Sequence, residues 1–172
     1  MADSTAAVPR RSGHDTPSLM LFGGVYGAVV ASAMVAALTE YGHNSAADRR
    51  YDAAWLLVTA FASALAHGYS HYIAERGPRL RLQGLRALAG EWPLVAAMLP
   101  SVLIVAGAGW GWWPADSDSV EHPAFAFNIA LLFVLGLVSA RRAGRRWPLT
   151  LVTGVVDAML GLLVVVANAV IK

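Results

Sequence analysis

The sequence contains no cysteine and carries little charge for its length. Of its 172 residues, 14% are charged and 57% are hydrophobic. A soluble globular domain carries about 25% charged residues, so this chain has too little charge to cover a soluble surface. The absence of cysteine excludes disulfides, thiolate metal sites and redox-active thiols. Because the sequence also lacks a phosphate-binding loop and a nucleophile motif, we expect no enzyme.

The hydrophobic residues are concentrated in five segments, each close to the ~20 residues that a membrane-spanning helix requires. These segments are residues 18–39, 53–74, 93–113, 123–140 and 148–171. We therefore expect residues 18–172 to form an all-α integral membrane domain with five transmembrane helices. Residues 1–17 are polar, and we expect a disordered cytoplasmic tail there.

The basic residues predict the orientation. Only Arg49, Arg50 and Lys172 fall outside if the N-terminus lies inside. The other ten of the 13 basic residues then lie in cytoplasmic segments: Arg10, Arg11, Arg76, Arg79, Arg81, Arg86, Arg141, Arg142, Arg145 and Arg146. Because basic loops stay inside, the pattern predicts an N-in, C-out protein that contacts membrane lipid and no nucleic acid. A composition rich in alanine and arginine and poor in lysine favours a bacterial cytoplasmic membrane.

Polar side chains at membrane depth are the candidate functional residues, because ionisable groups are rare within spans. His67 and His71 share one helix face, since they are four residues apart. At 1.5 Å per residue, His67 lies about 12 Å and Asp157 about 15 Å from the cytoplasmic ends of their helices. Tyr26 lies at a similar depth in the first span.

Three interpretations of this layer remain open. The first is a site for Fe²⁺, Mn²⁺ or Zn²⁺ with His67 and Asp157 as ligands, joined by His71 and Tyr26, because imidazole and carboxylate suit these ions. The second is proton transfer between His67 and Asp157. The third is an interhelical hydrogen bond without further function.

Small residues form a stripe on the first span. Gly23, Gly27 and Ala31 repeat every four residues, a spacing that lets helix backbones approach closely in lipid. We expect this stripe to form the seam of a homodimer, although packing within one protomer would need the same pattern.

The order of these features resembles the vacuolar iron transporter family. The first span reads LFGGVYGAVVASAMVAAL, the second ends in FASALAHGYSHYIAERG, and a short basic loop joins the last two spans. The resemblance covers about residues 20–170 and implies a dimeric cation/proton antiporter for ferrous iron or manganese, with the first helix near the dimer seam. Residues 25–27 stand where that family has Asn-Asp-Gly with an essential carboxylate, and residues 66–69 replace its methionine and Gly-Glu-Tyr region. The family's cytoplasmic metal-binding domain is absent.

The sequence thus predicts a membrane transporter of a divalent cation, coupled to protons as the resemblance implies. The alternative is a non-transporting accessory subunit that uses the same fold to anchor a partner protein. The missing first-span carboxylate favours the accessory subunit, whereas Asp157 favours transport.

Overall fold

The computed structural model describes residues 16–39, 44–74 and 89–171. Within these residues the chain forms five helices and no strand, which confirms the all-α class. Most of the predicted cytoplasmic tail and most of the basic connection before the third span lie outside the described residues. The helices are α1 (Thr16–Thr39), α2 (Ala46–Ala74), α4 (Trp92–Gly109), α5 (Ser117–Arg142) and α6 (Trp147–Ile171).

Four of the described helices, namely α1, α4, α5 and α6, are long and apolar enough to cross a membrane. This supports the prediction of an integral membrane protein. Helix α2 is longer still but does not reach the same hydropathy, because charged residues occupy its first turns and the two histidines its last. The fifth crossing therefore stays a prediction.

Two helices begin earlier than their apolar segments. Before α2, Ser45 and Asp48 bond reciprocally, with each backbone N–H donating to the other side chain, an arrangement that caps a helix N-terminus. Before α5, the Asp116 carboxylate accepts the backbone N–H of Ser119 at 2.9 Å. That hydrogen bond lowers the pKa of Asp116 from its ordinary value. Each cap adds about two turns of helix on the polar side of an apolar run.

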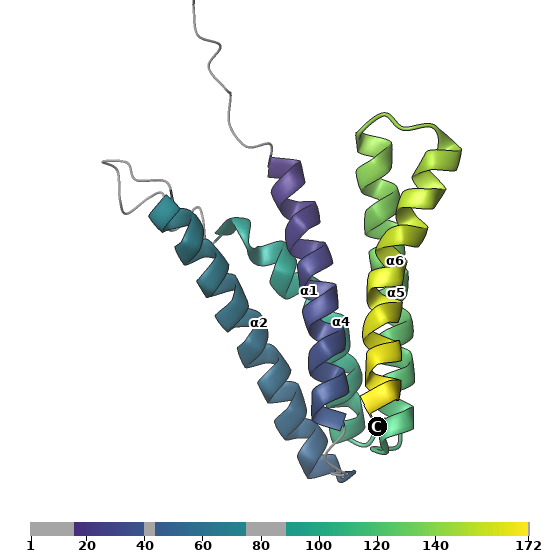
Figure 1. Cartoon of the computed structure of the whole chain (residues 1–172). Coiled ribbons are helices and arrows are strands. Elements are labelled where there is room, and N and C mark those ends of the chain that lie inside the picture. Colours follow the sequence, from purple (N-terminus) through teal and green to yellow (C-terminus); the bar gives the residue numbers. More distant parts are fainter. Residues whose placement is uncertain (1–15, 40–43, 75–88, 172) are drawn as a thin grey trace, which may run out of the picture.

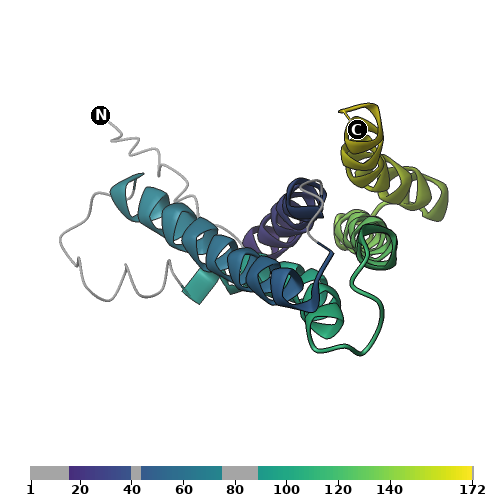
Figure 2. The ribbon, with the colours of Figure 1, turned by 90° about the horizontal axis from the view of Figure 1, so that it is seen from below.

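The helices form a row with α2 at one edge and α6 at the other (Figures 1 and 2). Helices α1 and α4 lie next to α2, and α5 and α6 form a hairpin at the other end of the row. Successive helices run in opposite directions. We call the end where α1, α4 and α6 begin the N-side, and the opposite end the C-side.

The small-residue stripe of α1 packs within the chain. A side-chain carbon added at Gly27 would lie 2.5 Å from the carbonyl oxygen of Leu94 on α4, and one added at Gly23 would lie 3.3 Å from the nitrogen of the same residue. Ala31 is fully buried. The stripe therefore serves the close approach of α1 and α4 in one protomer, which its pattern left open, and its face is not free for a dimer seam. The homodimer stays a prediction that needs another face.

A buried arginine at the C-side links several segments of the chain by hydrogen bonds. Arg49 is fully buried, and its guanidinium donates to the carboxylate of Asp52 at 3.0 Å, the carbonyl of Ala115 at 2.8 Å and the amide oxygen of Asn44 at 3.1 Å. A buried charge needs such partners. Arg49 thus joins the start of α2 to the connection between α4 and α5.

Candidate metal centre

One face of α2 leads from the core to the N-side. Ala53, Leu56, Ala60 and Ala64 are buried along this face, at the spacing of three and four residues that places side chains one above the other. His67 and His71 continue the same face for two further turns. The alanines let α4 approach α2 closely, so both imidazoles project toward the start of α4.

Glu91, the residue that precedes α4, lies at that position. Glu91 directly precedes the helix, with Pro93 in the first turn, and its carboxylate makes no capping hydrogen bond to the helix N-terminus. Its side chain is only 8% exposed, whereas that of His71 is 43% exposed. A buried carboxylate is therefore aimed from α4 toward a pair of accessible imidazoles on α2.

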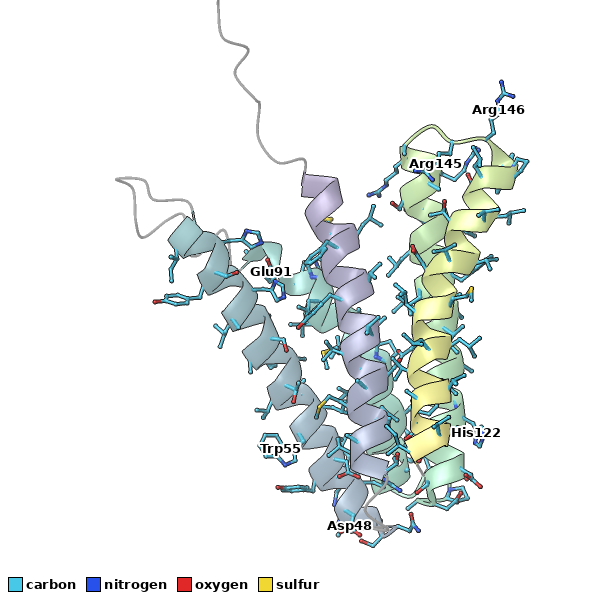
Figure 3. All side chains as sticks on the ribbon, viewed as in Figure 1. Asp48, Trp55, Glu91, His122, Arg145 and Arg146 are labelled. Atoms are coloured by element: carbon cyan, nitrogen blue, oxygen red, sulfur yellow. The ribbon has the colours of Figure 1, made fainter. Side chains whose placement is uncertain are left out.

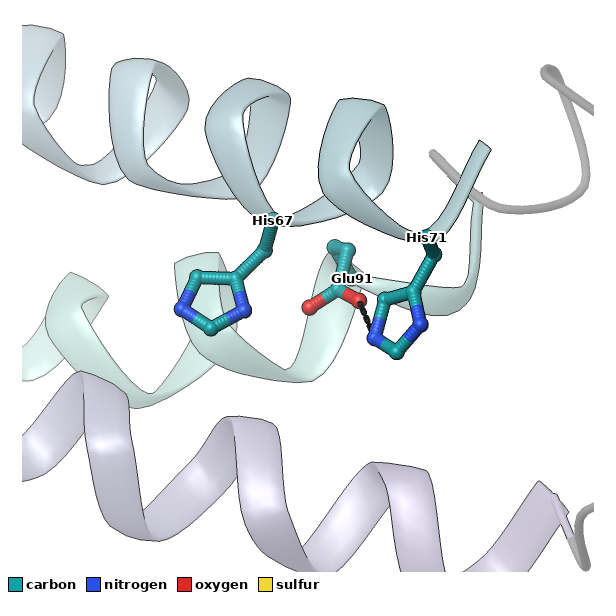
Figure 4. A group of neighbouring side chains, drawn as sticks. All are labelled: His67, His71 and Glu91. Atoms are coloured by element: carbon teal, nitrogen blue, oxygen red, sulfur yellow. Dashed lines mark ion pairs between the residues drawn. The ribbon is translucent and has the colours of Figure 1, made fainter. Parts of the chain in front are cut away.

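The three side chains converge (Figure 4). The Nε2 atom of His71 lies 3.6 Å from the Oε1 atom of Glu91. One donor atom from each of His67, His71 and Glu91 can be chosen so that all lie within 4.8 Å of one another. We call these three residues the His–His–Glu cluster.

Aromatic rings of α1 hold the imidazole of His67. The ring of Tyr26 lies 4.8 Å from that of His67 in a T-shaped arrangement, and the ring of Phe22 lies 5.9 Å away. Edge-to-face packing of this kind is a favoured arrangement of aromatic rings. Of the predicted site residues, Tyr26 thus lies beside His67 and contacts it through its ring.

Asp157 does not join the cluster. No Cα atom of α2 lies within 8 Å of a Cα atom of α6 in the described residues, so the expected meeting of His67 and Asp157 does not occur within one chain. Asp157 instead lies against α5, where a side-chain carbon added at Gly136 would lie 2.6 Å from its Oδ2 atom. The two residues share a depth but lie on opposite edges of the row.

The cluster can act in two ways. With His71 protonated, the His71–Glu91 contact is an ion pair that ties the end of α2 to the start of α4. With both imidazoles neutral, two nitrogens and a carboxylate oxygen form the donor set that Zn²⁺, Fe²⁺ and Mn²⁺ accept. Ligand atoms around a tetrahedral ion with bonds of about 2.1 Å lie roughly 3.4 Å apart. Side-chain rotations that move each ligand atom by about 1 Å would therefore bring the three atoms to coordination distance.

Glu91 was missed in the sequence because it lies at the end of an arginine-rich segment whose net charge indicated only a cytoplasmic connection. Its place directly before Trp92 and Pro93 is the available signal, since proline in the first turn marks a helix start. Glu91 was therefore a candidate third ligand, because it lies at a helix start on the same predicted side of the membrane as the two histidines.

Comparisons of the chain with models of known families, with curated proteins and with solved structures gave no match. The resemblance to vacuolar iron transporters therefore stays a prediction, and the geometry of the described residues is the basis for a functional proposal.

Proposed function

We propose that this protein is an integral membrane transporter whose cargo is a divalent transition-metal ion bound at the His–His–Glu cluster. The observation that carries the proposal is the convergence of His67, His71 and Glu91, from two helices, on one point at the N-side. In the five apolar segments of the sequence, the only acidic, basic or histidine residue besides the two histidines is Asp157.

The proposal places α2 in the membrane as the fifth crossing. Its outer face exposes Val58, Phe61 and Leu65 over the same length in which its inner face packs on α4. An exposed apolar face of this kind is suited to lipid. On the basis of the arginine distribution, we propose that the N-side faces the cytoplasm of a bacterial inner membrane, so that the cluster lies near the inner surface.

The donor set favours a borderline metal ion. Two imidazoles and one carboxylate suit Zn²⁺, Fe²⁺ and Mn²⁺ better than soft ions, which prefer thiolates, or Ca²⁺ and Mg²⁺, which prefer oxygen alone. The exposed side of His71 leaves room for water to complete the coordination. Such partial hydration suits a cargo that must be released again.

One observation favours the accessory subunit instead. Beyond His67, toward the C-side, the space between α1, α2 and α4 is filled by buried apolar side chains, including Val35, Leu56 and Met98. Transport therefore requires a second arrangement of α2 and α4, whereas a metal-binding or partner-binding subunit would need only the observed one.

The test measures binding and flux separately. Purified protein is titrated with Zn²⁺ or Mn²⁺ by calorimetry, and proteoliposomes that contain a metal-sensitive dye report entry of the same ion. We expect wild-type protein to bind and transport, and the double variant His67→Ala/His71→Ala to do neither. The matched control is His122→Ala, which removes an exposed histidine of α5 at the C-side, far from the cluster.

The outcomes separate the alternatives. Binding without flux in the wild-type protein supports the accessory subunit. Unchanged binding in the double variant overturns the metal site, and an equal loss in His122→Ala assigns the signal to non-specific histidine binding.

A further inference from the structure

The turn between α5 and α6 concentrates positive charge at the N-side of the hairpin. Arg141, Arg142, Arg145 and Arg146 are all exposed, and residues 122–156 contain no aspartate or glutamate. None of the four arginines forms an ion pair with another described residue. We call these four residues the arginine turn.

Backbone hydrogen bonds hold the arginine turn in a defined shape. The N–H of Gly144 donates to the carbonyl of Arg141 and the N–H of Arg145 to that of Ala140, which closes the end of α5. Gly144 adopts a φ of 71°, in the left-handed region that favours glycine. The N–H of Thr150 then donates to the carbonyl of Arg146 and begins α6. The guanidinium groups therefore project from a fixed frame.

The surroundings place these charges at the boundary between apolar and polar surface. The guanidinium of Arg141 lies 4.4 Å from the ring centre of Trp147, which is itself 60% exposed. Arg145 reaches along α6 to donate to the hydroxyl of Thr153 at 3.3 Å, whereas Arg146 extends away from the hairpin (Figure 3). Directly below, α6 exposes Leu149, Leu151 and Val152.

We propose that the arginine turn is a binding site for the phosphate headgroups of anionic phospholipids. A guanidinium matches a phosphate with two parallel hydrogen bonds, and tryptophan favours the level of the headgroups. The apolar surface of α6 continues from the turn without a break, so a lipid whose phosphate meets the arginines lays its acyl chains along Leu151 and Val152. That continuity selects a membrane lipid as the occupant over a soluble phosphate compound.

This site is independent of the metal proposal, because α6 and the His–His–Glu cluster lie on opposite edges of the row. It also assigns the arginines a role beyond orientation. A charge that only sets topology needs no fixed turn, whereas a headgroup site needs guanidiniums held in place above an apolar surface.

The test compares lipid retention by the full-length protein in mixed lipid. The protein is reconstituted in nanodiscs with equal amounts of phosphatidylglycerol and phosphatidylcholine of the same acyl chains, released into detergent, and analysed by native mass spectrometry. We expect the wild-type protein to retain phosphatidylglycerol preferentially. The variant Arg141→Gln/Arg142→Gln/Arg145→Gln/Arg146→Gln loses that preference by about tenfold or more, since each basic residue near an anionic surface contributes to attraction.

The matched control, Arg76→Gln/Arg79→Gln/Arg81→Gln/Arg86→Gln, removes the same charge from another segment and keeps the preference. An unchanged preference in the arginine-turn variant overturns the proposal, as does an equal loss in the control, because net charge alone would then explain retention.

The unfolding temperature of each variant in phosphatidylcholine alone is measured in parallel, and a loss of preference counts only for a variant that unfolds at the wild-type temperature. If the quadruple variant is destabilised, Arg142→Gln/Arg146→Gln replaces it, because these two side chains make no hydrogen bond to another described side chain, and its failure to reduce the preference overturns the proposal equally.

Discussion

The two edge helices place polar groups at similar depth but surround them differently. On α2, His67 and His71 face the start of α4, where Glu91 meets them. On α6, Asp157 faces Gly136 in the last two turns of α5, where the glycine makes room for it and no described residue hydrogen-bonds or pairs with it. The difference shows the value of a helix terminus. Side chains just outside a helix can turn toward a neighbour, whereas the middle of a helix offers only the side chains that packing permits.

Small residues make both arrangements possible. Alanines on the inner face of α2 let the start of α4 come close enough for a carboxylate to reach two imidazoles. Glycines at positions 136 and 154 bring α5 and α6 so close that Asp157 lies against backbone. Close approach of helices therefore brings three candidate ligands together where α2 meets the start of α4. Between α5 and α6 it leaves the Asp157 carboxylate without a partner among the described residues.

The largest contrast between the edges is expected in metal affinity. Glu91→Gln removes one of three ligands while keeping the size of the side chain, and we expect a loss of about 100-fold in affinity, at or above the effect known for residues that orient ligands. Asp157→Asn, the matched carboxylate-to-amide change on α6, leaves affinity unchanged. Calorimetric titration of both variants with Zn²⁺ makes the comparison, and an equal loss in both would show that the two edges form one site.

A second prediction concerns the close packing of α1 against α4, the helix that Glu91 precedes. In Gly27→Ala the new methyl group meets the Leu94 carbonyl oxygen at 2.5 Å and the Ala97 side chain at 3.0 Å. Because a backbone atom cannot yield as a side chain can, we expect a loss of about 1–3 kcal/mol in unfolding free energy. The control is Gly90→Ala, where nothing lies within 4 Å of the added carbon. Thermal unfolding in detergent followed by circular dichroism measures both, and equal melting temperatures would contradict the packing of α1 against α4.

The corresponding change at the contact between α5 and α6 is Gly136→Ala. Its methyl group would lie 2.6 Å from Asp157 Oδ2 and 2.8 Å from the Cα atom of Gly154. We expect about 1–2 kcal/mol of destabilisation, with metal affinity at the wild-type level. Adding Asp157→Ala to this variant recovers only part of the loss, because the contact with the Gly154 backbone remains. Full recovery would mean that the carboxylate alone fills the space.

The role of Tyr26 is tested by paired substitutions. Tyr26→Phe keeps the ring that packs on His67 and removes only the hydroxyl, so we expect metal affinity to persist. Tyr26→Ala removes the ring, frees the imidazole to rotate and weakens binding by about fivefold, corresponding to ~1 kcal/mol for an aromatic pair. If Tyr26→Phe weakens binding as strongly as Tyr26→Ala, the phenolic oxygen is a ligand, as the sequence first indicated.

The sequence predicts the class of fold because apolar segments of spanning length leave few alternatives. It also places His67 and His71 on one face, since helical spacing is local. The helix starts at Ala46 and Ser117 were missed, although the caps that set them, Ser45 with Asp48 and Asp116, are visible in the sequence. Their polar character made them look like loop.

The composition of the site was predicted less well, for a geometric reason. Counting residues gives the depth of a side chain but not its direction around the bundle, so His67 and Asp157 matched in depth while lying on opposite edges. The contact of Glu91 with His71 depends on how the end of α2 meets the start of α4. The proline that marks the helix start makes Glu91 a candidate, but the packing that decides whether it meets the imidazoles has no local signature.

Asp157 gives the smallest expected effect, and its sign is informative. A carboxylate in the middle of an apolar helix, with no partner in residues 16–39, 44–74 and 89–171, is costly to bury as a charge. Asp157→Asn keeps its shape and removes the charge, so we expect unfolding free energy to rise by about 1 kcal/mol, below the full penalty for a charge at a helix centre because the group is partly exposed. Thermal unfolding of the variant beside the wild-type protein measures the change. A fall in stability would mean that the carboxylate is paired with a group outside these residues, and Asp157 would then not differ from the histidines of α2 in lacking a partner.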